Sequence, residues 1–194
     1  MSEALRSFIA VKLPPETVER LRQAQARLRA ADTTWKWVEP GCFHLTLKFL
    51  GAVPRVGLEA VWGSVCEALA GTRSFTVSLR GLGVFPNARA PRVAWAGIDR
   101  GAAELAGMAA KVEEACAAHG FERERRAFTA HLTLGRAREP KPNPALAAVI
   151  EELSAVELGE AKVDRALLMK STLTPKGAIY QMLEEKLLES GEAG

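Results

Sequence analysis

Two copies of one tetrapeptide hold most of the histidine in this chain. The sequence contains only three histidines, and residues 44–47 and 131–134 both read HLTL. A single His-x-Thr string on a strand is usually structural, with the imidazole satisfied by a neighbouring backbone group. A second copy is hard to explain by chance in a composition so poor in histidine, and it indicates an internal duplication. The repeat therefore raises the question of what paired His and Thr side chains could do.

The residues around the first copy have the pattern of a strand with one buried face. Successive side chains of an extended chain point to opposite faces. His44, Thr46 and Lys48 therefore share one face of the segment HLTLKFLG, while Leu45, Leu47 and Phe49 share the other. A core has no need of His and Thr opposite its leucines, so this parity predicts a core face and a face for chemistry.

The second copy repeats this parity with His131 and Thr133. If the two strands lie side by side, two imidazoles and two hydroxyls converge from opposite sides. A pKa near about 6.5 lets one imidazole act as a neutral base while the other acts as a charged acid. Phosphoryl transfer at a ribose phosphate needs both roles, and threonine hydroxyls can donate to non-bridging phosphate oxygens. This chemistry requires no metal ion and no other cofactor.

The paired H-x-T-x motifs and the scaffold around them resemble the 2H phosphoesterases. Within that superfamily the sequence is most similar to the bacterial RNA 2′,3′-cyclic phosphodiesterases, which are also called 2′-5′ RNA ligases. The likeness covers nearly the whole chain. Its landmarks are FIAVKLPPE at 8–16, WVEPGCFHLTLKFLG at 37–51, GLGVFPNARAPRVAWAGI at 81–98, GFERERRAFTAHLTLGRAR at 120–138 and STLTPKGAIY at 171–180.

The resemblance implies both a fold and a reaction. The fold is α+β and bilobed about a pseudo-twofold axis, with two antiparallel sheets facing a central cleft and helices packed outside. The reaction is hydrolysis of a 2′,3′-cyclic phosphate, on RNA ends or small cyclic nucleotides, to a 2′-phosphomonoester. By the resemblance, His44 donates a proton to the leaving 3′ oxygen and His131 accepts a proton from water. Thr46 and Thr133 would hold the phosphate.

Two basic residues near the motifs are further candidates. Relatives place a phosphate-binding arginine five residues after the second histidine, which corresponds here to Arg136. Simple alternation would put Arg136 on the leucine face. A bulge at Gly135 would add one residue and turn the next side chain over, so the assignment predicts a bulge or a strand end there. Lys48 shares the parity of His44 and is a candidate substrate contact.

Aromatic residues near the motifs could stack on a base. Trp37 and Phe128 flank the motifs, and Tyr180 lies in a family-like segment, so these three are candidate substrate contacts. Trp62 in a predicted helix and Trp95 in an apolar strand are predicted to pack in the core.

The rest of the chain reads as short strands between helices. Helices are predicted after Pro14-Pro15, from Pro54, through Leu105 to Gly120, and over Leu146 to Leu153 after Pro142 and Pro144. Strands are predicted at 7–13, 35–50, 74–80, 92–98 and 128–135, and a hairpin with its turn at 174–177 is predicted over 163–188. The glycine- and proline-rich residues 81–91 read as a loop. No linker separates the halves, so we expect one domain, 1–194, made of two pseudo-symmetric lobes with one HLTL motif each.

Composition narrows the classes of partner. The net charge of +3 permits an anionic ligand without suggesting a broad nucleic-acid surface. The run ERERR at 122–126 mixes both signs, which is typical of a solvated face. The three cysteines of the chain are unclustered, which indicates neither a disulfide framework nor a zinc knuckle. Without a long apolar run or signal sequence, we expect a cytoplasmic monomer that does not bind membranes.

Three other functions stay open on this sequence. The same chemistry run in reverse, with a 5′-hydroxyl in place of water, would join RNA ends through a 2′-5′ bond. A non-catalytic RNA- or nucleotide-binding module would use the same surface for recognition alone. A metal-dependent hydrolase would use His44 and His131 as ligands, but no carboxylate or third histidine stands near them at a ligand-like spacing.

Overall fold

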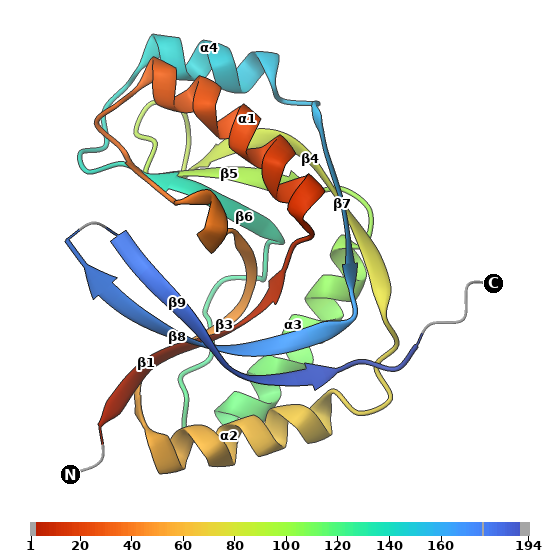
Figure 1. Cartoon of the computed structure of the whole chain (residues 1–194). Coiled ribbons are helices and arrows are strands. Elements are labelled where there is room, and N and C mark those ends of the chain that lie inside the picture. Colours follow the sequence, from red (N-terminus) through yellow and green to blue (C-terminus); the bar gives the residue numbers. More distant parts are fainter. Residues whose placement is uncertain (1–2, 176, 191–194) are drawn as a thin grey trace.

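The protein, described by a computed structural model over residues 3–175 and 177–190, is built on two antiparallel sheets (Figure 1). Within these residues the first sheet has the strand order β3-β1-β8-β9, with β1 (Ala4–Lys12), β3 (His44–Pro54), β8 (Arg165–Thr174) and β9 (Gly177–Leu187). The second sheet has the order β2-β6-β5-β4-β7, with β2 (Lys36–Trp37), β6 (His131–Arg136), β5 (Val93–Ile98), β4 (Phe75–Phe85) and β7 (Glu157–Val163). The predicted α+β class with two antiparallel sheets is confirmed.

The helices begin close to where the sequence predicts. They are α1 (Pro15–Ala31), α2 (Arg55–Ala68), α3 (Ala102–Ala117) and α4 (Pro144–Glu152), with a short 3-10 turn over Pro40–Cys42. Proline suits the first helical position because its φ is already helical and its missing N–H would have no partner there. At α4 the Asn143 side chain adds a cap by accepting from the amide of Leu146 at 3.1 Å.

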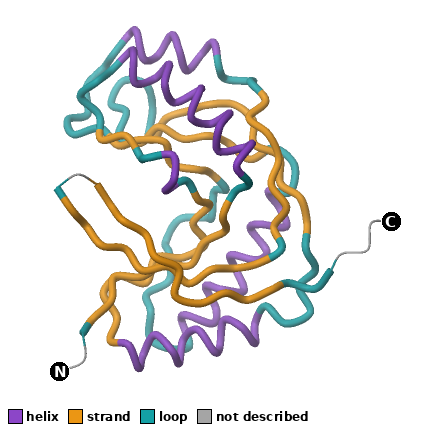
Figure 2. Tube along the Cα trace, in the orientation of Figure 1, coloured by secondary structure: helices purple, strands orange, loops and turns teal. Residues whose placement is uncertain are grey.

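The two halves of the chain interleave around the sheets. Helices α1 and α4 pack on β7 and β4 of the second sheet, and α2 and α3 pack on β3 of the first. Figure 2 shows the two helix pairs at opposite ends of the molecule. Each sheet is thus covered by one helix from each half of the chain.

A single hydrophobic cluster joins both sheets. It contains Leu45 and Leu47 from the first motif and Leu132 and Leu134 from the second, all of them buried. The prediction that the motif leucines form the core face is therefore confirmed.

Two features of the elements differ from the sequence expectation or extend it. Strand β4 continues through residues 81–85, which were predicted to be loop. A register shift between Leu79 and Leu82 and a φ of 72° at Gly81 mark a bulge, which lets the strand bend and run on. The predicted β8–β9 hairpin is present, and Lys176 in its turn lies outside the described residues.

In the described part of the chain, no helix has the length and apolar character needed to cross a membrane.

Candidate active site

The two motif strands meet at the junction of the sheets. Strands β3 and β6 contact one another although they belong to different sheets. His44 and Thr46 on β3 are half-buried, as are His131 and Thr133 on β6. We call the sheet faces that carry these four side chains the motif faces. Among the described residues, none forms a hydrogen bond with either threonine hydroxyl, so both are available to a ligand.

Both imidazoles are held by the same backbone contact. Nδ1 of His44 lies 2.7 Å from the carbonyl oxygen of Cys42, and Nδ1 of His131 lies 2.7 Å from that of Thr129. A carbonyl can only accept, so the contact requires a proton on Nδ1. Each neutral imidazole therefore keeps the lone pair of Nε2 for another partner. This arrangement fixes the tautomer and the ring orientation that acid–base chemistry needs.

The surroundings of the two imidazoles differ. The ring centroid of His44 lies 4.8 Å from that of Phe8 and 5.2 Å from that of Tyr180. Burial lowers the pKa of His44 from its ordinary value, and the bond to the Cys42 carbonyl opposes part of this shift. His131 has Phe85 edge-on at 5.2 Å.

A bulge follows the same position of both motifs. In the first sheet the pairing passes from Ala10 opposite Thr46 to Ile9 opposite Lys48, which leaves Leu47 as an extra residue. In the second sheet an equivalent register shift between Ala94 and Trp95 leaves Leu134 extra. The bulge predicted next to Gly135 is therefore present, and β3 has an unpredicted counterpart.

The first bulge overturns two assignments that rested on simple alternation. Lys48 was predicted to contact substrate, but the extra residue turns it to the core side, where it is 4% exposed and pairs with Glu113 at 2.7 Å. Phe49 was predicted to be core, but it is 48% exposed and lies beside Phe8 on the motif face, with ring centroids 5.6 Å apart. Both corrections have the same cause, because the added residue moves the side chains that directly follow it to the opposite face of the strand.

The second bulge brings Arg136 back to the motif face. Gly135 takes the core-side position, and a Cβ there would lie 2.4 Å from the ring of Trp37. Trp37 packs against the core and stacks on Trp35, and its Nε1 donates to the Asp32 carbonyl at 3.0 Å. The predicted substrate contact of Trp37 is therefore wrong. The side chain of Arg136 is exposed, and it forms no hydrogen bond or ion pair with any residue that the structure describes.

Comparison with known protein families also divides the chain into two halves with one motif each. The family model of the LigT-like phosphoesterases matches residues 11–95 and 97–180, so each match contains one HLTL copy. The chain belongs to the LigT-like phosphoesterase family.

Similar proteins support this membership over nearly the full length. A protein of Methanothermobacter thermautotrophicus named RNA 2′,3′-cyclic phosphodiesterase is 37% identical over 180 residues, covering 93% of this chain and 97% of that protein. A protein of Thermus thermophilus with the same name is 34% identical over 203 residues, covering 98% of this chain and 93% of that protein. The crystal structure of TT0787 of Thermus thermophilus superposes with a TM-score of 0.79 at 31% identity, covering 96% of this chain and all of that one. LigT of E. coli, solved with 3′-AMP, shares the fold with a TM-score of 0.78 at 24% identity over 96% of this chain and 99% of that one.

Tyr180 lies on the motif face of the first sheet of this LigT-like protein. It is half-buried on β9 beside Phe8 and His44. Burial raises the pKa of the Tyr180 hydroxyl, and the charge of Arg136 from the other sheet opposes that shift.

Trp95 is the third tryptophan near the LigT-like site, and its predicted place in the core is wrong. It is half-buried and lies directly opposite Thr133 on the motif face. Its ring covers Gly83, where an added Cβ would lie 2.2 Å from the indole, and it approaches Phe85 at 5.1 Å. The alternating burial of β5 was hidden in the sequence because alanine and glycine fill the other positions.

Two lysines near the site were missed by the sequence analysis. Lys12 lies opposite His44 on β1, and Lys36 lies opposite Arg136 on β2. Both are exposed, and directly opposed residues share a sheet face. Their only signal is strand register, which pairs residues far apart in sequence. Phe128 is 37% exposed in the segment before β6, and its substrate contact stays a prediction. Within the described residues, no group of three or more His, Cys, Asp or Glu could hold a metal ion.

Proposed function

We propose that this LigT-like phosphoesterase hydrolyses 2′,3′-cyclic phosphates at RNA ends or on nucleosides, and that the product is a 2′-phosphomonoester. The observation that carries the proposal is the matched pair of imidazoles, each held through Nδ1 by a carbonyl so that Nε2 is available to substrate. The relatives named RNA 2′,3′-cyclic phosphodiesterase support the choice of substrate.

In the proposed reaction the two Nε2 atoms act on the two oxygens that lie on opposite sides of the phosphorus, the attacking water oxygen and the leaving 3′ oxygen. His131 accepts a proton from water as the water oxygen attacks phosphorus. The bond between phosphorus and the 3′ oxygen then breaks, and His44 donates its proton to that oxygen. One proton enters His131 and one leaves His44, so exchange with solvent restores both residues after each turnover.

The surroundings of His44 suit the donor role in this scheme. A lowered pKa makes the protonated imidazole a stronger acid. An anionic phosphate beside Nε2 favours the charged imidazole, so that His44 is protonated when substrate binds. Thr46 and Thr133 donate to the non-bridging oxygens, and Arg136 neutralises the charge that builds on them.

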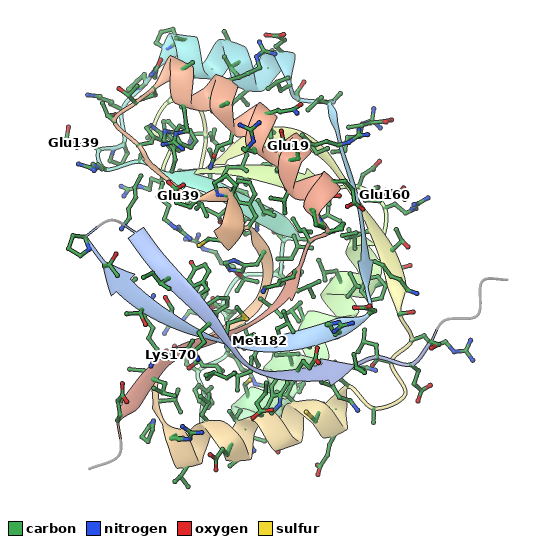
Figure 3. The ribbon with its side chains drawn as sticks, in the orientation of Figure 1. Glu19, Glu39, Glu139, Glu160, Lys170 and Met182 are labelled. Atoms are coloured by element: carbon green, nitrogen blue, oxygen red, sulfur yellow. The ribbon has the colours of Figure 1, made fainter. Side chains whose placement is uncertain are left out.

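The first sheet offers an apolar surface for the nucleoside. Phe49 and Met182 are about half exposed, and Tyr180 lies beside them on the same motif face. Met182 is seen on β9 in Figure 3. Bases stack on such aromatic side chains with little regard for sequence. This surface supports a nucleotide or RNA end over a simple phosphodiester.

The test uses a short RNA that ends in a 2′,3′-cyclic phosphate, incubated with the protein with and without excess EDTA. We expect equal turnover in both samples, and a terminal nucleotide that matches a 2′-phosphate standard by chromatography. A 3′-phosphate product would reverse the assignment of the leaving oxygen. Turnover that EDTA abolishes would favour a metal-dependent hydrolase, and tight binding without turnover a recognition module. An added RNA with a 5′-hydroxyl reports on ligation, which water at its bulk concentration disfavours.

A further inference from the structure

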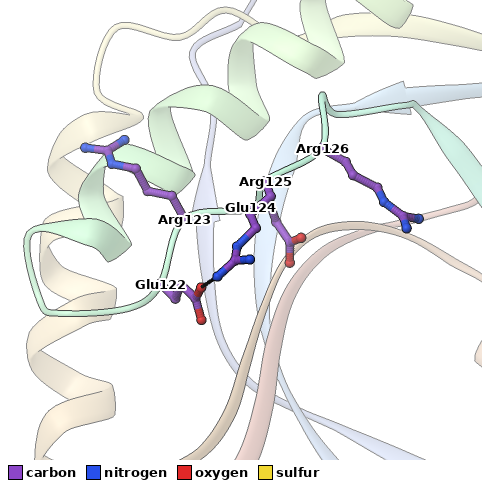
Figure 4. Close-up of a pocket in the computed structure, with 5 residues that line it drawn as sticks. All are labelled: Glu122, Arg123, Glu124, Arg125 and Arg126. Atoms are coloured by element: carbon purple, nitrogen blue, oxygen red, sulfur yellow. Dashed lines mark hydrogen bonds and ion pairs between the residues drawn. The ribbon is translucent and has the colours of Figure 1, made fainter.

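An irregular segment leads directly into the second motif. Residues 121–130, here called the entry segment, join α3 to β6 without forming a helix or strand. The charged run at 122–126 is exposed at every position, as predicted, and lines a surface hollow (Figure 4). Two ion pairs of this run, Arg123 with Glu114 and Arg125 with Glu122, are exposed to solvent. Exposed pairs contribute little to holding a segment in place.

One buried side chain from the other motif strand holds the entry segment. Nζ of Lys48 donates to the carbonyl oxygen of Glu122 at 2.7 Å and to Oε1 of Glu113 on α3 at 2.7 Å. The same Oε1 accepts from the amide of Glu124 at 2.9 Å. The side chain of Lys48 is 3% exposed and that of Glu113 is 21% exposed. The ammonium and the carboxylate together bind the backbone on both sides of Arg123.

The place of Lys48 in the strand makes this contact unusual. Lys48 stands at the core-side position after the first bulge, where the second motif has Gly135. A buried ion pair is weak evidence for stability, because desolvation costs offset much of the attraction. A packed apolar side chain would stabilise the core at least as well. The contacts of Lys48 therefore indicate a role in holding the entry segment in place rather than in stability.

The contact connects the two histidines through a short path. Lys48 lies four residues after His44 on β3 and fixes the start of the entry segment. The far end of that segment supplies the Thr129 carbonyl that orients His131. We propose that Lys48 is a positioning residue for His131, holding the entry segment against the first motif strand so that the two imidazoles keep their relative placement. This inference rests on the proposed function for its catalytic readout only.

The test compares four variants in hydrolysis of the cyclic phosphate. K48M keeps the stem and removes the charge, and we expect kcat to fall by about 10- to 100-fold with little change in KM, because misplaced catalytic groups affect the transition state. K48R keeps donors and should recover part of the loss. R123Q removes an exposed ion pair between the same segment and the same helix and should keep full activity. T17V removes a part-buried hydrogen bond from α1 to the Glu160 carbonyl on β7, which involves neither motif strand, and controls for lost stability.

Two further measurements separate position from stability. In K48M the trypsin cleavage rate at Arg125 and Arg126 should rise, and the His131 imidazole resonances should shift, while T17V changes neither. If K48M fails to fold, E113Q replaces it, because the amide oxygen keeps the same geometry without the charge, and a smaller loss of the same kind is expected. A K48M protein with full kcat and an unchanged His131 spectrum would overturn the proposal. An unmutated protein without turnover would overturn the proposed function, and the spectrum and the cleavage rate would still decide the role of Lys48.

Discussion

At the scale of single residues, the two motif histidines share one hydrogen bond and differ in what covers them. The Nδ1 contacts to Cys42 and Thr129 are equal in length. His44 is enclosed by Phe8 and Tyr180, whereas among the described residues His131 has one aromatic neighbour, Phe85. Equal orientation with unequal surroundings is what a pair with different proton-transfer roles needs.

Alanine at either motif histidine should remove one proton transfer. We expect His44→Ala and His131→Ala each to lower kcat by about 10²- to 10⁴-fold, since general acid–base catalysis contributes on that order. His119→Ala is the matched control, because His119 is the remaining histidine and its Nε2 lies 2.8 Å from the Ser64 hydroxyl in an exposed contact. Steady-state kinetics on the cyclic phosphate measure the effect. Near-normal turnover in either motif variant would show that the two-histidine mechanism is wrong.

The lowered pKa of His44 should also appear in folding stability. In the unfolded chain His44 takes up a proton near pH 6.5, the ordinary value, whereas in the folded protein His44 takes it up only at a lower pH. The unfolded state then binds more protons, so stability present above that pH is lost as the pH falls toward the folded value. Urea unfolding at about pH 7.5 and about pH 5 should show a smaller acid loss in His44→Asn than in His119→Asn. Equal losses in the two variants would contradict the lowered pKa of His44.

Residue parity predicted the motif side chains correctly and failed just after them. The His, Thr and Leu positions follow simple alternation, and the structure places them as expected. Lys48 and Phe49 do not, because no residue near Leu47 signals a bulge in the first copy. Gly135 did supply such a signal in the second copy. A glycine can mark a bulge in a sequence, but a bulge closed by ordinary residues is visible only in the pairing of strands.

At the scale of elements, the bulge in β6 is supported by a side chain from a helix. Gln25 on α1 is 1% exposed, and its amide donates to the carbonyl of the extra residue Leu134 at 2.8 Å and to that of Val38 at 2.7 Å. The Leu134 carbonyl also accepts from the Val38 amide at 2.9 Å. Gln25 lies on the buried side of α1 with Leu21, and its partners on β6 and just after β2 are far from it in sequence, so only the fold brings them near.

Gly135→Ala tests whether this bulge orients Arg136. The new methyl would lie 2.4 Å from the Trp37 ring, so the ring or the strand must move. We expect kcat/KM to fall by about tenfold or more, since small displacements near a site are costly. Tryptophan fluorescence should report the movement of Trp37. Gly107→Ala is the control, because that exposed site on α3 has open space and alanine favours a helix. A displaced Trp37 with unchanged kcat/KM would show that the bulge does not position Arg136.

At the scale of the whole molecule, the sequence repeat predicted two lobes but not how the helices are shared. The halves of the chain read alike, which suggests that each folds as its own lobe. Instead α1 packs on the second sheet and α3 on the first. Strands β8 and β9 from the end of the chain complete the sheet begun by β1. Helical periodicity shows that one face of a helix is buried, and it does not show which sheet buries that face.

Interleaving predicts that the two lobes unfold together. One hydrophobic cluster contains Leu21 of α1, Val112 of α3 and the leucines of both motifs, so neither sheet can open without exposing a shared core. We expect a single urea transition, with far-ultraviolet circular dichroism and tryptophan fluorescence giving the same midpoint, because small cooperative domains behave as two states. Trp62 reports on α2 and Trp95 on the second sheet. In each of the variants Trp62→Phe and Trp95→Phe, the fluorescence midpoint should equal the circular dichroism midpoint. Different midpoints from the two probes within one variant would show two independent domains, and the predicted single domain would then be wrong.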